Sequence, residues 1–269
     1  MTASLDLDAY FARIQWGGGT RPTLDTLAGL LHAHTARIPF ENLDVLLGRP
    51  VRLDLNALQG KLVRAGRGGY CFEHATLFAA VLEALGFRPV RHAARVVLFA
   101  PRTEMPRTHM FLSVAVEGAR FIVDPGFGLY APRVPVPLAE GEAVRIGGDR
   151  HWMARDGNVW VLHAQRGGQA VSGWVTTLEQ ENPIDFEVAN HYVATHPASL
   201  FRNRIMLSAV TPEGRVNVMN RDVTVLRADG AESLQLADRA ALRALLAEHF
   251  GFDLPEVEQL RVPAIREWE

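Results

Sequence analysis

Apolar residues in the first 86 positions recur with the period of an α-helix. Residues 5–14 form one amphipathic stretch, and a second stretch begins after Thr23, a residue type that caps helix N-termini. A third helix is expected at about 54–64. A fourth helix, which Gly86 is suited to end, has an apolar face made of Leu77, Phe78, Val81, Leu82 and Leu85. The pattern predicts a mostly helical region over residues 1–86.

Beyond residue 86 the pattern changes to one that is typical of β-strands. Residues 90–99 are rich in β-branched and apolar side chains, and residues 108–116 alternate between two faces. A third strand at 121–124 ends at Pro125-Gly126. Further short strands are expected at 150–156, 158–164 and 171–178. The middle region, residues 87–190, is therefore predicted to be an antiparallel sheet or barrel.

The last region, residues 191–269, mixes both patterns. A helix is expected around 186–195, and a closing helix at about 238–250 has Gly251 as its stop. Between them the pattern predicts strands at 201–206, 216–220 and 223–227. We assign the chain to the α+β class, with domains at 1–86, 87–190 and 191–269.

Composition and charge narrow the class of protein. The chain has 269 residues, of which 48% are hydrophobic, and this is enough for a packed core. The formal net charge is −2, and the sequence has no basic stripe of the kind that binds nucleic acid. No apolar run is long enough to span a bilayer. The single cysteine excludes an internal disulfide, and the first residues lack the pattern of a signal peptide. We expect a soluble cytoplasmic protein that binds neither nucleic acid nor membrane; its oligomeric state stays open.

The single cysteine, Cys71, lies where a glycine-rich loop meets the fourth helix. Gly68 and Gly69 precede it and allow a substrate to approach the backbone closely. At a helix N-terminus, unpaired N–H groups and the helix dipole favour a thiolate over a thiol. A lone cysteine is more often a small buried apolar residue, so its position alone leaves both interpretations open.

A cysteine nucleophile needs a basic or cationic partner, and that partner needs an orienting group. His109 begins one strand and Asp124 ends the next, so an antiparallel pairing would bring the two side by side. Four other histidines compete for the role of partner: His74, His92, His151 and His191. An aspartate before Pro-Gly is also typical of an ordinary turn. Residue types and spacing leave a Cys71–His109–Asp124 triad as one hypothesis among these.

A metal site is less favoured by the sequence. The chain has one cysteine, and no pair of histidines has the spacing and neighbouring acid of a zinc-enzyme motif. We therefore expect no metal cofactor.

Five short motifs follow one another along the chain. In order they are Ile38-Pro39-Phe40-Glu41-Asn42-Leu43, Arg67-Gly68-Gly69-Tyr70-Cys71-Phe72-Glu73, Thr108-His109-Met110, Val123-Asp124-Pro125-Gly126-Phe127-Gly128 and Asn190-His191-Tyr192-Val193-Ala194-Thr195-His196-Pro197. Together they resemble the motifs of the arylamine N-acetyltransferase family, in that family's order and over essentially the whole chain. The resemblance implies a helical bundle, a β-barrel and an α/β lid, with the core arrangement of papain-like cysteine proteases and transglutaminases.

The resemblance also implies a chemistry. Acetyl-CoA, the co-substrate, would acetylate the cysteine, and an arylamine, arylhydrazine or N-hydroxyarylamine would then take the acetyl group in a ping-pong reaction. The family's roles carry over onto Cys71 as nucleophile, His109 as acid–base partner and Asp124 as orienting group. A role in xenobiotic metabolism is the expectation that follows.

The same resemblance implies a substrate pocket. Phe40 and Phe127 would line the pocket of the aromatic acceptor, and Gly126 would border the approach of the coenzyme. Flat aromatic walls select a flat aromatic substrate through burial and edge-to-face contact. The residues that hold the adenine and phosphates of coenzyme A are not identified by the motifs.

Two charged residues lie within otherwise apolar or tight motifs. We expect Arg67 and Glu41 to pair and to pin the Cys71 loop to the end of the second helix, because buried charges persist mainly when paired. Glu73 falls in the first turn of the fourth helix, where an acid suits the helix dipole.

Three other functions share parts of this pattern. An amide synthase would use the cysteine to carry a large acyl chain, and would turn over acetyl-CoA poorly. A cysteine hydrolase would use water as the acceptor, so it would hydrolyse acetyl-CoA without an amine. A non-catalytic relative usually lacks a triad member, and the chain retains Cys71, His109 and Asp124. The acetyltransferase is the function that we expect.

Overall fold

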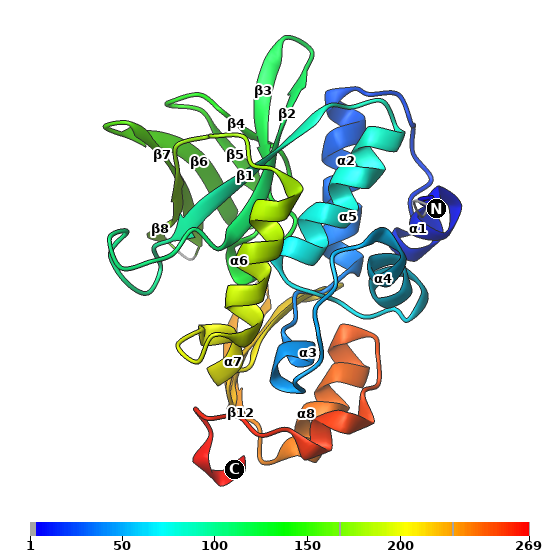
Figure 1. Cartoon of the computed structure of the whole chain (residues 1–269), viewed down its shortest axis with the longest axis vertical. Helices are drawn as coiled ribbons and strands as arrows, with labels where there is room; N and C mark the ends of the chain where they lie inside the picture. The colour runs from blue at the N-terminus through cyan, green and yellow to red at the C-terminus, as the bar shows by residue number, and fades with distance from the viewer. Residues whose placement is uncertain (1–3, 167, 228, 269) are drawn as a thin grey trace.

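The structure, a computed structural model, describes residues 4–166, 168–227 and 229–268 (Figure 1). Its helices and strands form three regions in chain order. In Figure 1 the helices of the first region lie beside the sheet of the second, and the C-terminal part lies below both.

The first region consists of helices, as predicted. They are α1 (Leu7–Ile14), α2 (Leu24–Arg37), α3 (Leu43–Leu46), α4 (Leu55–Leu58), its π-helical continuation η1 (Gln59–Arg64) and α5 (Cys71–Ala84). The Thr23 side chain caps α2 by accepting a hydrogen bond from the Thr26 N–H. Gly86 follows α5 with a φ of 84°, a conformation that favours glycine. The predicted helix starts at Thr23 and Cys71 are confirmed, as is the stop at Gly86.

Helix α5 lies between the other helices and the sheet. Its Leu77 and Phe78 are fully buried and belong to the same core as Leu30 of α2 and Leu112 of the adjacent strand. Burial of a side chain of this size contributes roughly 1.5–3 kcal/mol to folding. Packing on both sides therefore fixes the helix that begins at Cys71.

The second region is a nearly closed antiparallel sheet of eight strands. They are β1 (Pro89–Val96), β2 (His109–Val116), β3 (Ala119–Val123), β4 (Val136–Pro137), β5 (Ala143–Ile146), β6 (Asp149–Asp156), β7 (Val159–Arg166) and β8 (Gln169–Thr176). Their order in the sheet is β4-β3-β2-β1-β8-β7-β6-β5, and β4 also packs against β5 and β6. The predicted barrel-like sheet is confirmed, with β4 and β5 as additional short strands.

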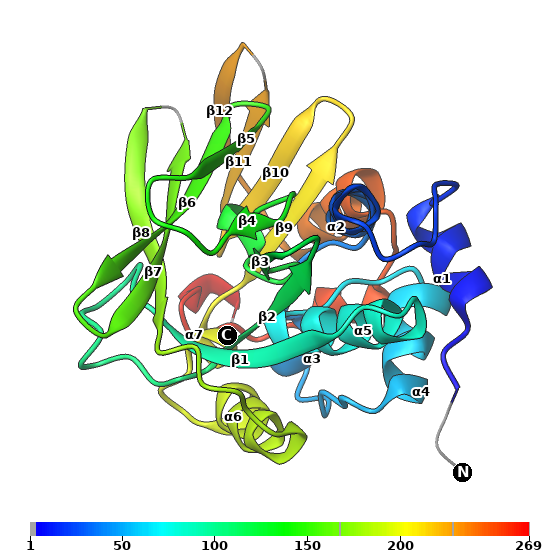
Figure 2. The same cartoon turned by 90° about the horizontal axis from the view of Figure 1, so that it is seen from above.

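A short 3-10 helix, η2 (Gly128–Tyr130), follows β3, and the third region begins after the barrel. The third region contains α6 (Pro183–Thr195), α7 (Leu200–Asn203), β9 (Met206–Thr211), β10 (Gly214–Met219), β11 (Asp222–Arg227), β12 (Gly230–Gln235), α8 (Arg239–Leu245), η3 (Leu246–Phe250), η4 (Pro255–Gln259) and η5 (Arg266–Trp268). Strands β9 to β12 form a second antiparallel sheet, in the order β12-β11-β10-β9. Figure 2 shows the β9–β10 hairpin beside the barrel, where β9 packs against η2.

The prediction of a strand at 201–206 is wrong. Its first residues belong to α7, and strand β9 begins only after them. The Ser199 hydroxyl accepts a hydrogen bond from the Phe201 N–H, and the Asn203 side-chain amide donates to the Ser199 carbonyl at 2.7 Å. These polar contacts close a helical turn that the apolar content of the segment conceals.

Helix α6 spans residue 190, the position of the expected boundary between the second and third domains. Its Phe186 and Val193 are buried in the core of the helical region. Asn190 accepts a hydrogen bond from the Tyr70 hydroxyl and donates one to the Val51 carbonyl at 2.9 Å. The helix thus connects the start of the third region to the loop before Cys71.

Candidate active site

Cys71 is the first residue of α5 and is 4% exposed. Tyr70 is the N-cap residue, and its N–H donates to the Glu73 carboxylate at 3.0 Å. A Cβ on Gly68 would lie 2.0 Å from the Pro39 carbonyl oxygen, so only glycine fits there. The loop is therefore held on both sides, and it presents the sulfur at the positive end of the helix dipole.

The β2–β3 hairpin brings His109 and Asp124 together. The two strands are antiparallel, and Asp124 directly follows β3. Nε2 of His109 lies 2.8 Å from Oδ2 of Asp124, and both side chains are buried. With Nε2 on the carboxylate, Nδ1 is the ring nitrogen that remains for Cys71.

The pKa of His109 is raised to about 10. Burial by itself would lower the pKa, but the charge and hydrogen bond of Asp124, together with the hydrogen bond and charge of Cys71, outweigh it. His109 therefore carries a proton at neutral pH, between a carboxylate and a sulfur.

Asp124 is fixed through both of its oxygens. Oδ2 accepts a second hydrogen bond, from Nε1 of Trp174 in β8, at 2.9 Å. Oδ1 accepts from the Gly126 N–H at 3.3 Å. Because these donors lie on different elements, the carboxylate cannot turn away from His109 without breaking contacts to the barrel.

Gly126 brings the turn after Asp124 against the nucleophile helix. A Cβ at this position would lie 2.6 Å from the Cα of Cys71. Any side chain there would displace either Cys71 or the turn, so a hydrogen atom is the only substituent that fits.

The two predicted pocket phenylalanines border the segment that follows. The Phe127 ring lies 5.1 Å from the His109 ring, centroid to centroid. Phe40 lies over the backbone of Gly128, where a Cβ would be 3.2 Å from its ring. The structure thus brings Cys71, His109, Asp124, Gly126 and Phe127 into one neighbourhood, with Phe40 at its edge.

Comparison with known proteins connects this geometry to a family. The model of a family described as N-acetyltransferase matches residues 23–259. An arylamine N-acetyltransferase of Mycobacterium tuberculosis is 41% identical over 94% of this chain and 92% of that protein. The chain belongs to the arylamine N-acetyltransferase family. A member from Escherichia coli is 35% identical over 94% of this chain and 90% of its own.

Solved structures of arylamine N-acetyltransferases share the fold. The Mycobacterium tuberculosis structure has a TM-score of 0.88 and 40% identity, and the match covers 94% of this chain and 96% of that one. A Mycobacterium marinum structure in complex with CoA has a TM-score of 0.88 and 37% identity, covering 94% of each chain. The family assignment made from the five motifs is confirmed, as is the mixed α/β fold with its barrel-like sheet.

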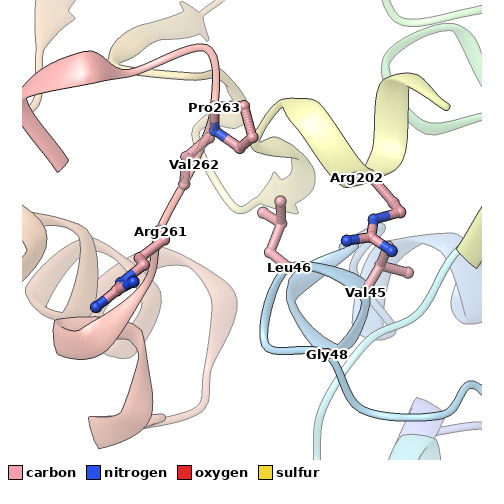
Figure 3. A pocket seen from close by; sticks show the side chains of 7 residues that line it. All are labelled: Val45, Leu46, Gly48, Arg202, Arg261, Val262 and Pro263. Carbon is pink, nitrogen blue, oxygen red and sulfur yellow. The ribbon is translucent and has the colours of Figure 1, made fainter. Parts of the chain in front are cut away.

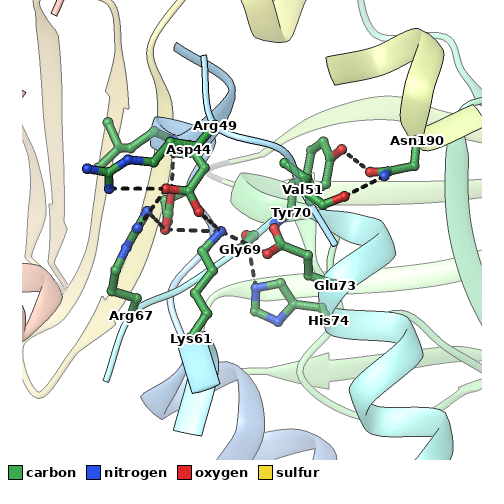
Figure 4. A network of polar contacts seen from close by, with 12 residues as sticks. Asp44, Arg49, Val51, Lys61, Arg67, Gly69, Tyr70, Glu73, His74 and Asn190 are labelled. Atoms are coloured by element: carbon green, nitrogen blue, oxygen red, sulfur yellow. Dashed lines mark hydrogen bonds and ion pairs between the residues drawn. The ribbon is translucent and has the colours of Figure 1, made fainter. Parts of the chain in front are cut away.

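In this member of the family, a buried ionic network holds the loop before Cys71 (Figure 4). It consists of Glu41, Asp44, Lys61, Arg67 and Glu73. Arg67 lies 2.6 Å from Glu41 and 2.7 Å from Asp44, so the predicted Arg67–Glu41 pair is confirmed. Lys61 lies 2.8 Å from both Asp44 and Glu73. Burial raises the pKa of Glu73 to about 6 although Lys61 opposes it, whereas three carboxylates outweigh burial and raise the pKa of Lys61.

A second network beneath the same loop, the Tyr10–His34–His74 chain, is formed by uncharged groups. The Tyr10 hydroxyl lies 2.8 Å from Nδ1 of His34, and Nε2 of His34 lies 2.9 Å from Nδ1 of His74. Nε2 of His74 lies 3.1 Å from the Gly69 carbonyl oxygen and 3.2 Å from that of Pro39. Burial lowers the pKa of His74 to about 4 and that of His34 well below its ordinary value, so both rings are neutral at pH 7.

The carbonyls of Gly69 and Pro39 determine the direction of each hydrogen bond in the Tyr10–His34–His74 chain. A carbonyl only accepts, so Nε2 of His74 carries the ring proton and its Nδ1 is bare. His34 must then donate through Nε2, which leaves its Nδ1 to accept from the Tyr10 hydroxyl. His74, which the sequence offered as an alternative to His109, is therefore engaged away from the sulfur.

Two of these contacts, Trp174 with Asp124 and His34 with His74, were not predicted from the sequence. Trp174 contacts Asp124 across 50 residues of chain, and His34 contacts His74 across 40. The sequence marks Trp174 only as part of an expected strand and His34 only as part of an expected helix. A buried tryptophan usually has a partner for its N–H, and this was the one signal available for it.

Figure 3 shows a cavity of about 430 Å³. It is formed between α3, α7 and the C-terminal segment, and is lined by Val45, Leu46, Gly48, Arg202, Arg261, Val262 and Pro263. None of the six predicted site residues, all of which the structure describes, is among them. We therefore locate the candidate site by the chemistry at Cys71 and not by cavity size.

The described ranges 4–166, 168–227 and 229–268 contain neither a candidate metal site nor a candidate membrane-spanning helix. No group of three or more His, Cys, Asp and Glu side chains there is arranged to hold a metal ion. No helix in that part of the chain combines the length and apolar character needed to cross a membrane.

Proposed function

We propose that this protein is an arylamine N-acetyltransferase that carries the acetyl group on Cys71. The observation that supports this most is that His109 is hydrogen-bonded to Asp124 and that Cys71, the first residue of α5, is close enough to help raise the pKa of its ring. Family membership supports acetyl-CoA as the donor, since a relative binds CoA in its solved structure. A Salmonella typhimurium relative is named for both arylamine N- and N-hydroxyarylamine O-acetyl transfer.

In the first half-reaction, the Cys71 sulfur attacks the thioester carbonyl of acetyl-CoA. A new C–S bond forms to Cys71 as the bond to the coenzyme sulfur breaks. The His109 imidazolium gives its proton to the departing thiolate, so coenzyme A leaves as a thiol. Negative charge on the carbonyl oxygen in between is favoured by the N-terminal end of α5.

In the second half-reaction, the nitrogen of the acceptor attacks the acetyl-cysteine. An arylamine is a weak base with a free lone pair at neutral pH, so it needs no prior deprotonation. Neutral His109 takes the proton from the nitrogen as the C–S bond breaks, which restores the imidazolium beside the Cys71 thiolate. Asp124 holds the ring in one orientation through both steps.

The acceptor pocket that we propose is aromatic. Phe127 beside His109 and Phe40 over Gly128 offer flat apolar surfaces for an arylamine, arylhydrazine or N-hydroxyarylamine. Gly126 lies against Cys71, so we place it at the border of the coenzyme's approach to the sulfur.

We also propose a core arrangement, a domain division and a cellular setting for this enzyme. A papain- and transglutaminase-like core is supported by a cysteine at a helix start that faces a histidine on a sheet. The domains at 1–86, 87–190 and 191–269 are supported by the order of the elements, which are helices, then the eight-stranded sheet, then the second sheet with its helices. The single cysteine supports a reducing, cytoplasmic setting, and the aromatic acceptor supports a role in xenobiotic metabolism.

The test is an intact-mass measurement on the purified protein with acetyl-CoA in the absence of amine. We expect a mass increase of one acetyl group on the wild type and none on Cys71→Ser. Addition of an aromatic amine or hydrazine should remove the increase and yield the acetylated amine. No increase, or an increase that water removes as fast as the amine does, would contradict the proposal.

A further inference from the structure

Three arginines meet around one carboxylate where the barrel touches the third region. Asp149 begins β6, Arg166 ends β7, Arg215 lies in β10, and Arg133 lies between η2 and β4. Arg166 binds Asp149 through Nε at 2.6 Å and through Nη2. Arg215 approaches the same carboxylate at 3.5 Å. We refer to these four residues as the arginine cluster.

The arginine cluster holds more positive than negative charge. The guanidinium groups of Arg166 and Arg215 contact Asp149, and the pKa of Arg133 responds to the charge of the same carboxylate. Among the described residues no other carboxylate lies within ion-pair distance of these arginines. The Arg215 side chain is only 7% exposed. Burial and the guanidinium groups of Arg166 and Arg133 lower the pKa of Arg215 to about 9, against the opposing effect of Asp149. Buried charge of one sign is costly unless an anion compensates it.

Two N–H donors of the arginine cluster are buried without a hydrogen-bond partner among the described residues. They are Nε of Arg133 and Nη1 of Arg166. Nη2 of Arg133 lies 3.2 Å from Nε2 of the exposed His32, the one side chain among the described residues to which Arg133 is hydrogen-bonded. A guanidinium presents its donors in a planar fork that matches the oxygens of a carboxylate or phosphate. The unused donors and the excess charge therefore point to the same kind of ligand.

The arginine cluster adjoins the candidate site. A cavity of about 20 Å³, which has room for one water-sized group such as a single anionic oxygen, is lined by Arg133 and Arg215 and also by Phe40 and Gly128. Arg215 donates hydrogen bonds to the carbonyls of Gly128, at 3.4 Å, and Leu129. Leu129 is three residues beyond the glycine that touches Cys71, and three residues span at most about 11 Å. An anion in this cavity is within reach of a small molecule held at the sulfur.

We propose that Arg133 and Arg215 bind an anionic oxygen group, carboxylate or phosphoryl, of a substrate that reacts at Cys71. Two sources carry this chemistry: a carboxylate on the aromatic acceptor, and the phosphates of acetyl-CoA. The identity of the substrate rests on the proposed function, whereas anion binding itself does not.

The site is tested first by titration calorimetry, without any catalysis. Acetate and inorganic phosphate are the probes, and wild type is compared with Arg133→Gln and with Arg102→Gln. Arg102 is half exposed and pairs with Asp156 on the barrel surface, so it is a matched control. We expect saturable binding of at least one probe, about tenfold weaker for Arg133→Gln because a charge-assisted hydrogen bond is lost, and unchanged for Arg102→Gln. Absence of saturable binding, or equal affinity in Arg133→Gln, would overturn the proposal.

Kinetics then assign the source of the anion. In the acceptor arm, kcat/KM is compared for 4-aminobenzoate and the uncharged 4-aminobenzamide. In the donor arm, it is compared for acetyl-CoA and the phosphate-free acetyl thioester of N-acetylcysteamine. A fall of about tenfold in Arg133→Gln for only the charged member of one pair identifies that source. If the ratio of kcat/KM between the charged and uncharged member is unchanged by Arg133→Gln in both arms, a role in substrate binding is overturned. If the wild type does not transfer acetyl at all, the proposed function fails, and the calorimetry still decides whether the arginine cluster binds an anion.

Thermal unfolding provides the control for folding. Because Arg133→Gln removes excess positive charge, its Tm without added anion should equal or exceed that of wild type, and the rise in Tm on adding the bound probe should shrink. Arg133→Lys keeps the charge but loses the fork, so it should recover only part of the affinity. A lower Tm for Arg133→Gln in the absence of anion would contradict the premise of excess charge.

Discussion

The loop before Cys71 is held from two sides by networks of different character. The ionic network reaches it through Glu73, which accepts from the Tyr70 N–H. The Tyr10–His34–His74 chain reaches it through His74, which donates to the Gly69 carbonyl. One network therefore holds a backbone donor with charge, and the other holds a neighbouring backbone acceptor with neutral groups.

This difference decides how each network responds to a change. Removing one partner of a buried ion pair leaves an uncompensated charge, whereas removing a neutral partner leaves only an unpaired hydrogen-bonding group. The two networks also respond to pH in opposite directions, because burial raises the pKa of Glu73 and lowers that of His74.

Lys61→Met should be the most destabilising of these changes. It leaves Asp44 and Glu73 without the ammonium group that lies 2.8 Å from each, so we expect a loss of about 3–5 kcal/mol in the free energy of unfolding. Chemical denaturation measures this loss. Arg52→Met, which breaks a pair with Asp54 at the surface, should cost less than about 1 kcal/mol. Similar losses for both variants would remove the distinction between the buried network and a surface pair.

The pH dependence of stability should differ between variants of the two networks. The folded protein binds a proton at Glu73 more readily than the unfolded chain does, so this residue's contribution is present below about pH 4.5 and is lost as pH rises through about 6. His74 behaves oppositely: its contribution is present above about pH 6.5 and is lost as pH falls towards 4. At about 1.4 kcal/mol for each pH unit, the His74 effect is about 3 kcal/mol.

Urea unfolding between pH 4.5 and 6 checks this contrast. Glu73→Gln should make stability rise more steeply with pH than it does in wild type, because the opposing contribution is gone. His74→Gln should make the rise shallower. Parallel curves for the two variants would show that neither residue titrates as its surroundings indicate.

His74→Leu should cost about 2 kcal/mol at neutral pH. The substitution leaves Nε2–H of His34 buried without an acceptor and removes a donor from the Gly69 and Pro39 carbonyls. Thermal or urea unfolding gives the value, and His191→Leu on the exposed side of α6 serves as the control, expected within about 0.5 kcal/mol of wild type. Equal stability of the two variants would mean that the buried histidine pair contributes nothing.

Tyr10→Phe should have the smallest effect, about 1 kcal/mol, because it removes one hydrogen bond and leaves only Nδ1 of His34 unpaired. The carbonyls set the tautomers, so both histidines should keep their proton on Nε2 in this variant. Nitrogen-15 NMR of the imidazole rings distinguishes the two tautomers. Movement of the proton to Nδ1 of His34 would show that the tyrosine, and not the carbonyls, sets the direction.

Sequence patterns predicted the parts of the candidate site that lie close together in the chain. The start of α5 follows from a loop that meets a periodic apolar stretch, and the approach of His109 to Asp124 follows from two adjacent strands with a short turn. In both cases local chain geometry leaves few alternatives. The ion pair between Arg67 and Glu41 was also predictable, because each of these charged residues lies in a motif that is otherwise apolar or rich in glycine.

Long-range partners were not predictable in the same way. Periodicity shows which face of a helix or strand is buried, but not which distant side chain meets it, so Trp174 on Asp124 and His34 on His74 could not be derived. The turn at α7 was missed because its side-chain caps compete with an apolar pattern that favours a strand. Strand β12 was missed because it is an exposed edge strand without alternation.

The fixed direction of the Tyr10–His34–His74 chain has a consequence for proton movement. A row of hydroxyl and imidazole groups can conduct protons when its last member has a group that accepts and releases one. Here the last acceptors are the amide carbonyls of Gly69 and Pro39, which do neither at neutral pH. The Tyr10–His34–His74 chain therefore does not relay protons to the loop before Cys71, and its role there is to hold the backbone.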